Sequence, residues 1–151
     1  MAEEIIGLGK LIRRIGQMAT DTKHVERPLK AAGAYMLGST EKTFQQQGRP
    51  KRWTPLASST LARRRKGRGR GGAKILIDKG KMKSQVAFTV HSKGVEIGLN
   101  AVQARRQHFG YPGGTGPGHS KTPARPFLLI QEPEDTTAIG NIFRRHIARR
   151  G

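Results

Sequence analysis

The stretch TPARPFLLIQEPED, residues 122–135, carries the clearest local constraints on the backbone. Two prolines bracket Arg125, four apolar residues follow directly, and an acidic Pro-Glu-Asp then opens a helical pattern. Each proline fixes its own φ and biases the preceding residue towards extended backbone. We therefore expect residues 125–131 to form a short strand that pairs with a sheet in one register, with Arg125 at its N-terminal end. A helix is expected over residues 134–149, with basic residues in its last turn.

Helical periodicity dominates the N-terminal third of the sequence. Residues 3–19 place apolar side chains on one helical face, and residues 25–46 do so again. Pro28 suits the first turn of the second helix, where a missing N–H costs little. Shorter helices are expected over residues 56–65 and 101–109.

A strand pattern occupies residues 75–99. The segments QVAFTVHS and GVEIGLN alternate apolar and polar side chains around a tight turn at residues 92–94. The order of elements predicts an α+β fold, in which a small, mainly antiparallel sheet packs with N-terminal and C-terminal helices. We expect a single domain over residues 1–151, with a helical part at 1–48, a long basic loop region at 49–74, and the sheet and last helix at 75–151.

Positive charge dominates the composition and is unevenly placed. The chain has 29 Lys and Arg against 10 Asp and Glu, a formal net charge of +19. Residues 49–83 hold thirteen of these basic residues and one acid, a net of +12. Such a chain repels its own copies unless nucleic acid, an anionic surface or an acidic protein is near.

The densest charge is an arginine-rich run beside glycines. Residues 66–72, KGRGRGG, combine like charge with glycine, so we expect a mobile loop there. Such a loop can follow phosphates without reading bases, can meet an acidic protein, or can be solvated with no partner. The residues expected to contact phosphates or an acidic partner are Arg63, Arg64, Arg65, Lys66, Arg68 and Arg70.

Patterns for catalysis and metal binding are weak. The chain has no cysteine, and its five histidines show no short metal-ligand spacing. The acids are isolated or lie near helix starts, and no nucleophile stands beside a base and an orienting acid. We therefore expect no enzyme, no metal and no cofactor. No apolar run approaches about 18 residues, so no membrane span or membrane partner is expected.

Four segments, in order over residues 53–130, share a pattern with one known family. WTPLASSTL resembles its W-x-P-L-x-x-x-T-L, and TPARPFL resembles its I-P-A-R-P-F-L most closely. ILIDKGKM resembles I-L-x-x-T-G-x-L, with Lys79 in place of the usual Thr and Met82 in place of Leu. QARRQHFG resembles A-x-x-H-Q-x-G, with the order around His108 altered. Through these segments the chain resembles the phage virion morphogenesis, or tail-completion, family of Mu-like and related tailed phages.

The resemblance implies a small subunit without catalysis, assembled in the host cytoplasm into the neck of the virion. There it would form a ring of about six copies around the DNA channel, between the portal side and the tail tube. Its partners would be neighbouring neck, portal-side and tail-tube proteins, and the genomic DNA backbone without sequence specificity. The residues expected at inter-subunit contacts or at the strand entry are Trp53, Pro123, Arg125, Pro126 and Phe127.

Two other functions stay open at this point. One is a capsid assembly factor, which would leave before maturation. The other is a free nucleic-acid-binding protein without sequence specificity, for which the charge alone would account.

Overall fold

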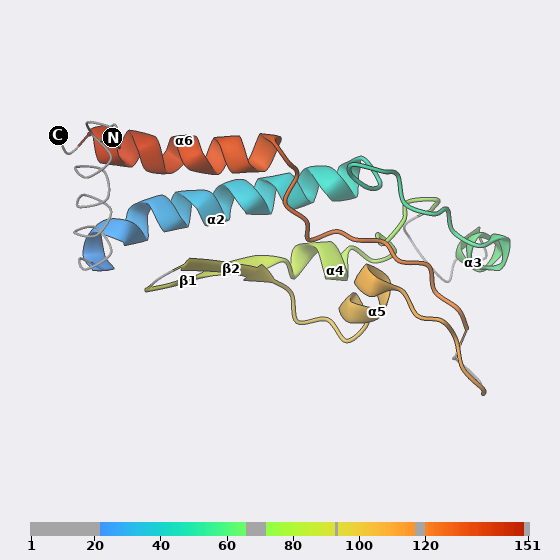
Figure 1. Cartoon of the computed structure of the whole chain (residues 1–151). Coiled ribbons are helices and arrows are strands. Elements are labelled where there is room, and N and C mark those ends of the chain that lie inside the picture. The colour runs from blue at the N-terminus through green and yellow to red at the C-terminus, as the bar shows by residue number, and fades with distance from the viewer. Residues whose placement is uncertain (1–21, 66–71, 93, 117–119, 150–151) are drawn as a thin grey trace, which may run out of the picture.

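The computed structural model describes residues 22–65, 72–92, 94–116 and 120–149. Two long helices, α2 (Thr22–Gln45) and α6 (Glu134–Ala148), lie side by side and antiparallel (Figure 1). A hairpin of β1 (Ala87–His91) and β2 (Gly94–Gly98) covers the other side of α2, so α2 is the middle layer. These elements confirm the expected α+β class: a two-stranded antiparallel sheet packs against the N-terminal helix α2, and the C-terminal helix α6 packs against α2 as well. The helix expected over residues 3–19 lies outside the described residues.

Three short helices occupy the end of the molecule away from the start of α2. They are α3 (Ser58–Arg63), α4 (Lys81–Ser84) and α5 (Ala104–Phe109) (Figure 1). The helices predicted around α3 and α5 are confirmed, although both are shorter than the periodicity suggested. None of the described helices has the length and apolarity needed to cross a membrane.

Helix α2 buries one stripe because its apolar side chains recur at helical spacing. Leu29, Ala32, Met36 and Phe44 are all buried. The prediction that Pro28 lies in the first turn was wrong: the helix begins at Thr22, which places Pro28 inside it. The pyrrolidine nitrogen carries no hydrogen, so the helix lacks one backbone hydrogen bond at this point.

The hairpin approaches α2 closely at Gly33. A Cβ atom at this position would lie 2.3 Å from Cδ2 of Phe88, which is far inside van der Waals contact. In the antiparallel register Phe88 pairs with Ile97, and Val90 pairs with Val95. The missing side chain of Gly33 therefore lets the ring of Phe88 lie directly against the helix.

The main core cluster lies where α2 ends and the short helices begin. Its buried members are Phe44, Trp53, Ile75, Met82, Ala104 and Phe127. The ring of Phe44 meets that of Trp53 edge-on at 5.6 Å between centroids, and meets that of Phe127 at 5.5 Å. Such aromatic pairs add about 0.5–1.5 kcal/mol beyond the area they bury.

The strand expected over residues 125–131 does not form, and the described sheet has two strands. The backbone is extended, but its N–H groups bond to helices instead of to a neighbouring strand. The N–H of Arg125 donates to the carbonyl of Gln107 at 2.8 Å, and that of Phe127 faces Nδ1 of His108 at 3.3 Å. The N–H of Gln131 donates to Oδ2 of Asp135 at 2.7 Å. The two prolines favour an extended backbone for the segment, but they do not determine which groups accept hydrogen bonds from its N–H groups.

Candidate functional site

A groove of about 600 Å³ lies between α3, the segment at residues 120–125 and α5. Two of the basic residues singled out from the sequence, Arg63 and Arg64, line it together with Pro123 and Arg125. We call it the α3 groove. Lys121 adds a further positive charge, and Asp78 is the one acidic side chain in the lining. The groove is therefore strongly cationic, and it is built by the segments that carry the family-like motifs.

Arg125 forms the floor of the α3 groove and is held on all sides. Its side chain is 6% exposed, Nε donates to the carbonyl of Thr54 at 3.0 Å, and Nη2 donates to that of Pro55 at 3.1 Å. A longer bond of 3.3 Å joins Nη1 to Oε1 of Gln107. Burial, and then the charge of Arg64, lower the pKa of Arg125, although a guanidinium remains protonated at any relevant pH. Arg125 thus connects the segment that precedes α3, the proline-flanked segment and α5.

The neighbouring predicted residues point into the core. The indole N–H of Trp53 donates to the carbonyl of Pro126 at 2.8 Å. Trp53 is 6% exposed and Phe127 only 1%, so neither offers a partner much side-chain surface. Their contribution to inter-subunit contacts stays a prediction. The prediction that this segment is the entry to a strand was wrong, because no strand follows.

His108 supports the same segment from α5. Its ring packs edge-on against that of Phe127, with centroids 5.0 Å apart, and Nδ1 faces the Phe127 N–H at 3.3 Å. Burial lowers the pKa of His108, which favours the neutral ring. A neutral ring with an unprotonated Nδ1 can accept this N–H, whereas the imidazolium cannot.

The arginine run is not uniform. Arg64 donates from Nη1 to the carbonyls of Gly72 and Lys74, at 3.0 and 2.8 Å, and its Nε lies 3.6 Å from the carboxylate of Asp78. Arg63 and Arg65 are exposed. The structure therefore uses Arg64 to fix the chain on both sides of residues 66–71 and leaves its two neighbours facing outward. Residues 66–71 lie outside the described residues. They include Lys66, Arg68 and Arg70 and all of the loop expected at 66–72 except its last residue.

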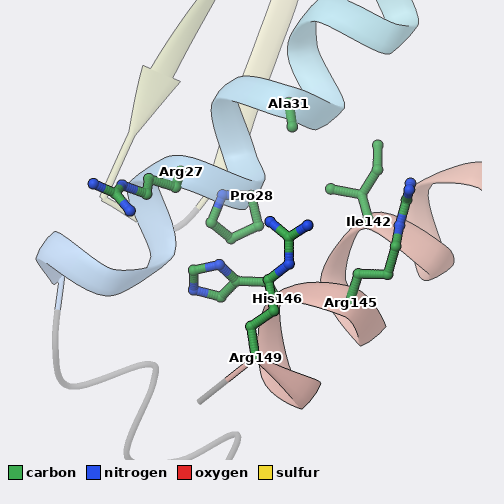
Figure 2. A pocket seen from close by; sticks show the side chains of 7 residues that line it. All are labelled: Arg27, Pro28, Ala31, Ile142, Arg145, His146 and Arg149. Carbon is green, nitrogen blue, oxygen red and sulfur yellow. The ribbon is translucent and has the colours of Figure 1, made fainter.

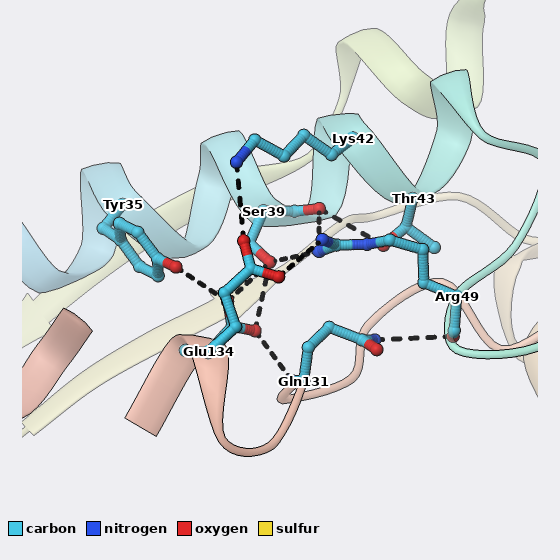
Figure 3. Close-up of polar contacts among 8 residues, drawn as sticks. Tyr35, Ser39, Lys42, Thr43, Arg49, Gln131 and Glu134 are labelled. Atoms are coloured by element: carbon cyan, nitrogen blue, oxygen red, sulfur yellow. Dashed lines mark hydrogen bonds and ion pairs between the residues drawn. The ribbon is translucent and has the colours of Figure 1, made fainter. Parts of the chain in front are cut away.

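Sequence reasoning missed a buried polar cluster between α2 and α6 (Figure 3). The carboxylate of Asp135 is fully buried and accepts from the hydroxyls of Tyr35, at 3.0 Å, and Ser39, at 2.9 Å. Arg49 donates from Nη2 to Oγ of Ser39 at 2.6 Å and pairs with Glu134 at 3.4 Å. Burial, and then the bond to Asp135, raise the pKa of Tyr35. The cluster clamps the end of α2 to the start of α6.

No local signal in the sequence pointed to this clamp. From the sequence, the acids after Pro133 were expected only to open a helix, because no local pattern distinguishes Asp135 from Glu134. Glu134 is exposed and meets Arg49 and, at 3.6 Å, Lys42, whereas Asp135 turns inward.

Two apolar side chains on and beside α5 remain in solvent. Val102 is 101% exposed and Phe109 is 73% exposed. With Arg105 and Tyr111 they line a shallow hollow of about 540 Å³. We call it the α5 patch. Exposed apolar groups rimmed by polar ones are typical of protein contact surfaces.

Within the described ranges, no group of three or more His, Asp or Glu side chains is arranged to hold a metal ion. No curated protein and no solved structure matches the chain. The model of the phage virion morphogenesis family matches residues 7–148, which is most of the chain. This match confirms the family indicated by the motifs around the α3 groove, a structural family that is generally non-enzymatic. The chain belongs to the phage virion morphogenesis family.

Proposed function

We propose that this chain is a structural head–tail connector, or tail-completion protein, that closes into a ring at the virion neck. The ring would lie between the portal side and the tail tube and surround the DNA channel. The observation that carries the proposal is the α3 groove, a cationic groove that Arg63 lines in the most basic part of the chain, with the exposed Arg65 two residues further along. Family membership supplies the setting, the phage virion.

The hydrogen bonds around α3 matter because an arginine binds anions best when it loses little conformational entropy on binding. Arg64 and Arg125 hold α3 and its neighbours through bonds to backbone carbonyls. The guanidinium is a planar fork suited to phosphate and carboxylate, and it stays charged. Arg63 and Arg65 would then meet the DNA backbone in the channel, or an acidic face of the next ring, without reading bases.

Ring closure needs two different surfaces on each subunit, because head-to-tail contacts are heterologous. The α5 patch suits one of them, with a second copy of this chain as its occupant. Val102 and Phe109 supply apolar area that solvent covers in the isolated chain. A net charge of +19 opposes self-association, so the ring should form only beside DNA or acidic neighbours.

Analysis of purified particles separates this function from its alternatives. A neck protein is present at a fixed ratio to the portal, with about six copies expected for a single closed ring. A capsid assembly factor would occur in precursor particles and disappear from mature ones. A free nucleic-acid-binding protein would stay with DNA in the lysate and show no fixed ratio to the portal.

A further inference from the structure

A second cationic pocket (Figure 2) lies at the end of the molecule that Figure 1 shows opposite to α3. It has a volume of about 400 Å³ and is formed by the beginning of α2 and the end of α6. One wall is apolar and consists of Pro28, Ala31 and Ile142. We call it the terminal pocket.

The rest of the lining of the terminal pocket is basic. Arg27, Arg145, Arg149 and His146 surround the apolar wall, and the three arginines are exposed. Among the described residues, no carboxylate pairs with any of these arginines; the adjacent Glu26 is engaged by Lys30 at 2.6 Å. The only side-chain bond described for the three joins Nε of Arg145 to the carbonyl of Asn141 at 3.3 Å.

His146 adds an independent observation. Its Nε2 is buried and has no hydrogen-bond partner among the described residues. A buried polar atom without a partner costs about 1–3 kcal/mol, so native structures rarely leave one unmatched. Within the part of the chain that the structure describes, the terminal pocket thus combines arginines without a carboxylate partner, one buried nitrogen without a hydrogen-bond partner, and an apolar wall.

The acids of the described part of the chain are mostly engaged elsewhere. Glu41 pairs with Lys83, Asp78 with Arg64, and Glu96 with His91. Glu134 and Asp135 belong to the clamp between α2 and α6. Outside the described residues, the sequence has one place where acids adjoin apolar side chains, namely residues 3–6, Glu-Glu-Ile-Ile.

We propose that residues 3–6 of this chain bind in the terminal pocket. Glu3 and Glu4 would bring carboxylates to the arginine forks and to Nε2 of His146. Ile5 and Ile6 would cover the apolar wall. A bare phosphate matches the cations equally well but makes no use of that wall, which is why a peptide segment fits better than a nucleic-acid backbone.

Chain length permits the contact. Residues 7–21 connect this segment to the start of α2, and fifteen residues can span about 22 Å as a helix and up to about 50 Å fully extended. The entropic cost of closing a loop increases only slowly with its length, so a loop of this size opposes the contact only weakly. The same reach would let the segment bind the terminal pocket of a neighbouring copy. The proposal does not depend on the ring at the neck.

The absence of cysteine makes a direct test possible in the full chain. In the double variant Ile5→Cys/Ala31→Cys, a disulfide should form rapidly under mild oxidation. The matched control is Ile5→Cys/Ala57→Cys, in which the exposed partner lies beside α3 at the far end of the molecule. A non-reducing gel distinguishes a bridge within one chain from a bridge between two, and either one supports the proposal. Bridging no faster than in the control would overturn it.

Charge reversal provides a second readout that does not rely on one cysteine pair. Glu3→Arg/Glu4→Arg should slow bridging roughly three- to ten-fold, as for exposed ion pairs, and so should Arg145→Glu/Arg149→Glu. Combining both changes should restore the rate, and thermal unfolding checks that each variant is folded. If the combination stays slow, and reversal of the arginines instead weakens DNA binding, the pocket takes phosphate and the proposal is wrong.

Discussion

Ser39 and Asp135 are 96 residues apart in the sequence, yet Oγ of Ser39 lies 2.9 and 3.0 Å from the two carboxylate oxygens of Asp135. Ser39 lies on α2, and Asp135 is the second residue of α6. The carboxylate also accepts the N–H of Gln131 at 2.7 Å, so it orders the segment that leads into α6. This buried contact fixes the two long helices relative to each other and, through them, the two ends of the molecule.

Replacing Asp135 by Asn should destabilise the fold although the shape is kept. The amide nitrogen would face donors from Tyr35, Ser39 or Gln131, and a buried donor left without an acceptor costs about 1–3 kcal/mol. Urea unfolding measures the loss. The control Glu134→Gln removes an exposed charge and should change stability by less than about 1 kcal/mol. Equal effects of the two substitutions would show that the clamp adds no more than a surface pair.

Gly33→Ala should also destabilise the protein, because the new methyl group would collide with the ring of Phe88. Overpacking of this kind typically costs about 1–3 kcal/mol. Gly38 is the matched control on the same helix, since a Cβ there meets nothing within 4 Å. Gly38→Ala should be neutral or stabilising by up to about 1 kcal/mol. If both variants unfold at the wild-type urea concentration, the hairpin does not lie on α2 as described.

His108 should make stability depend on pH. Burial holds its folded-state pKa below the ordinary value of 6.5, so the unfolded chain takes up a proton first as pH falls. The stability that the neutral ring supplies is therefore complete above the unfolded pKa and is lost as pH falls through the folded one. In His108→Asn the amide oxygen can replace Nδ1 as acceptor without titrating. The difference in the free energy of unfolding between wild type and variant should change in favour of the variant from pH 7.5 to pH 5, that is, from about one unit above to about one and a half units below the ordinary pKa. A constant gap over that range would contradict the prediction.

Arg64 should contribute to stability, whereas its neighbours Arg63 and Arg65 should contribute to binding of a partner. Arg64→Gln should lower stability, because the side chain bonds to the carbonyls of Gly72 and Lys74. The double variant Arg63→Gln/Arg65→Gln should leave stability unchanged, since both side chains are exposed. If each contacts one phosphate, the slope of log affinity against log salt for duplex DNA should shrink by roughly two. An unchanged slope together with failed head–tail joining would indicate an acidic protein as the partner. If both readouts stayed at wild-type level, the two arginines would be solvated side chains without a partner.

Periodicity predicted the long helices and the hairpin because each of them buries one face along its own length. The third strand was wrong for a physical reason: prolines fix φ, whereas a strand also needs a neighbour with free backbone groups. Residues 125–131 instead found their partners in α5 and α6. The motif around Arg125 did not indicate that its guanidinium is buried and bonded to the carbonyls of Thr54 and Pro55, and the role of Arg125 at a contact between subunits stays a prediction. The contact between Ser39 and Asp135 was out of reach because no local pattern relates residues 96 positions apart.

An image of the neck in purified particles would show whether this chain forms a ring there. We expect a closed ring of about six copies between the portal and the tail tube. In it, Arg63 and Arg65 should face the DNA channel or an acidic surface of the next ring, and the α5 patch should be covered by an adjacent copy. Mature particles that lack the protein, or a ring in which the α5 patch and both arginines face solvent, would contradict it.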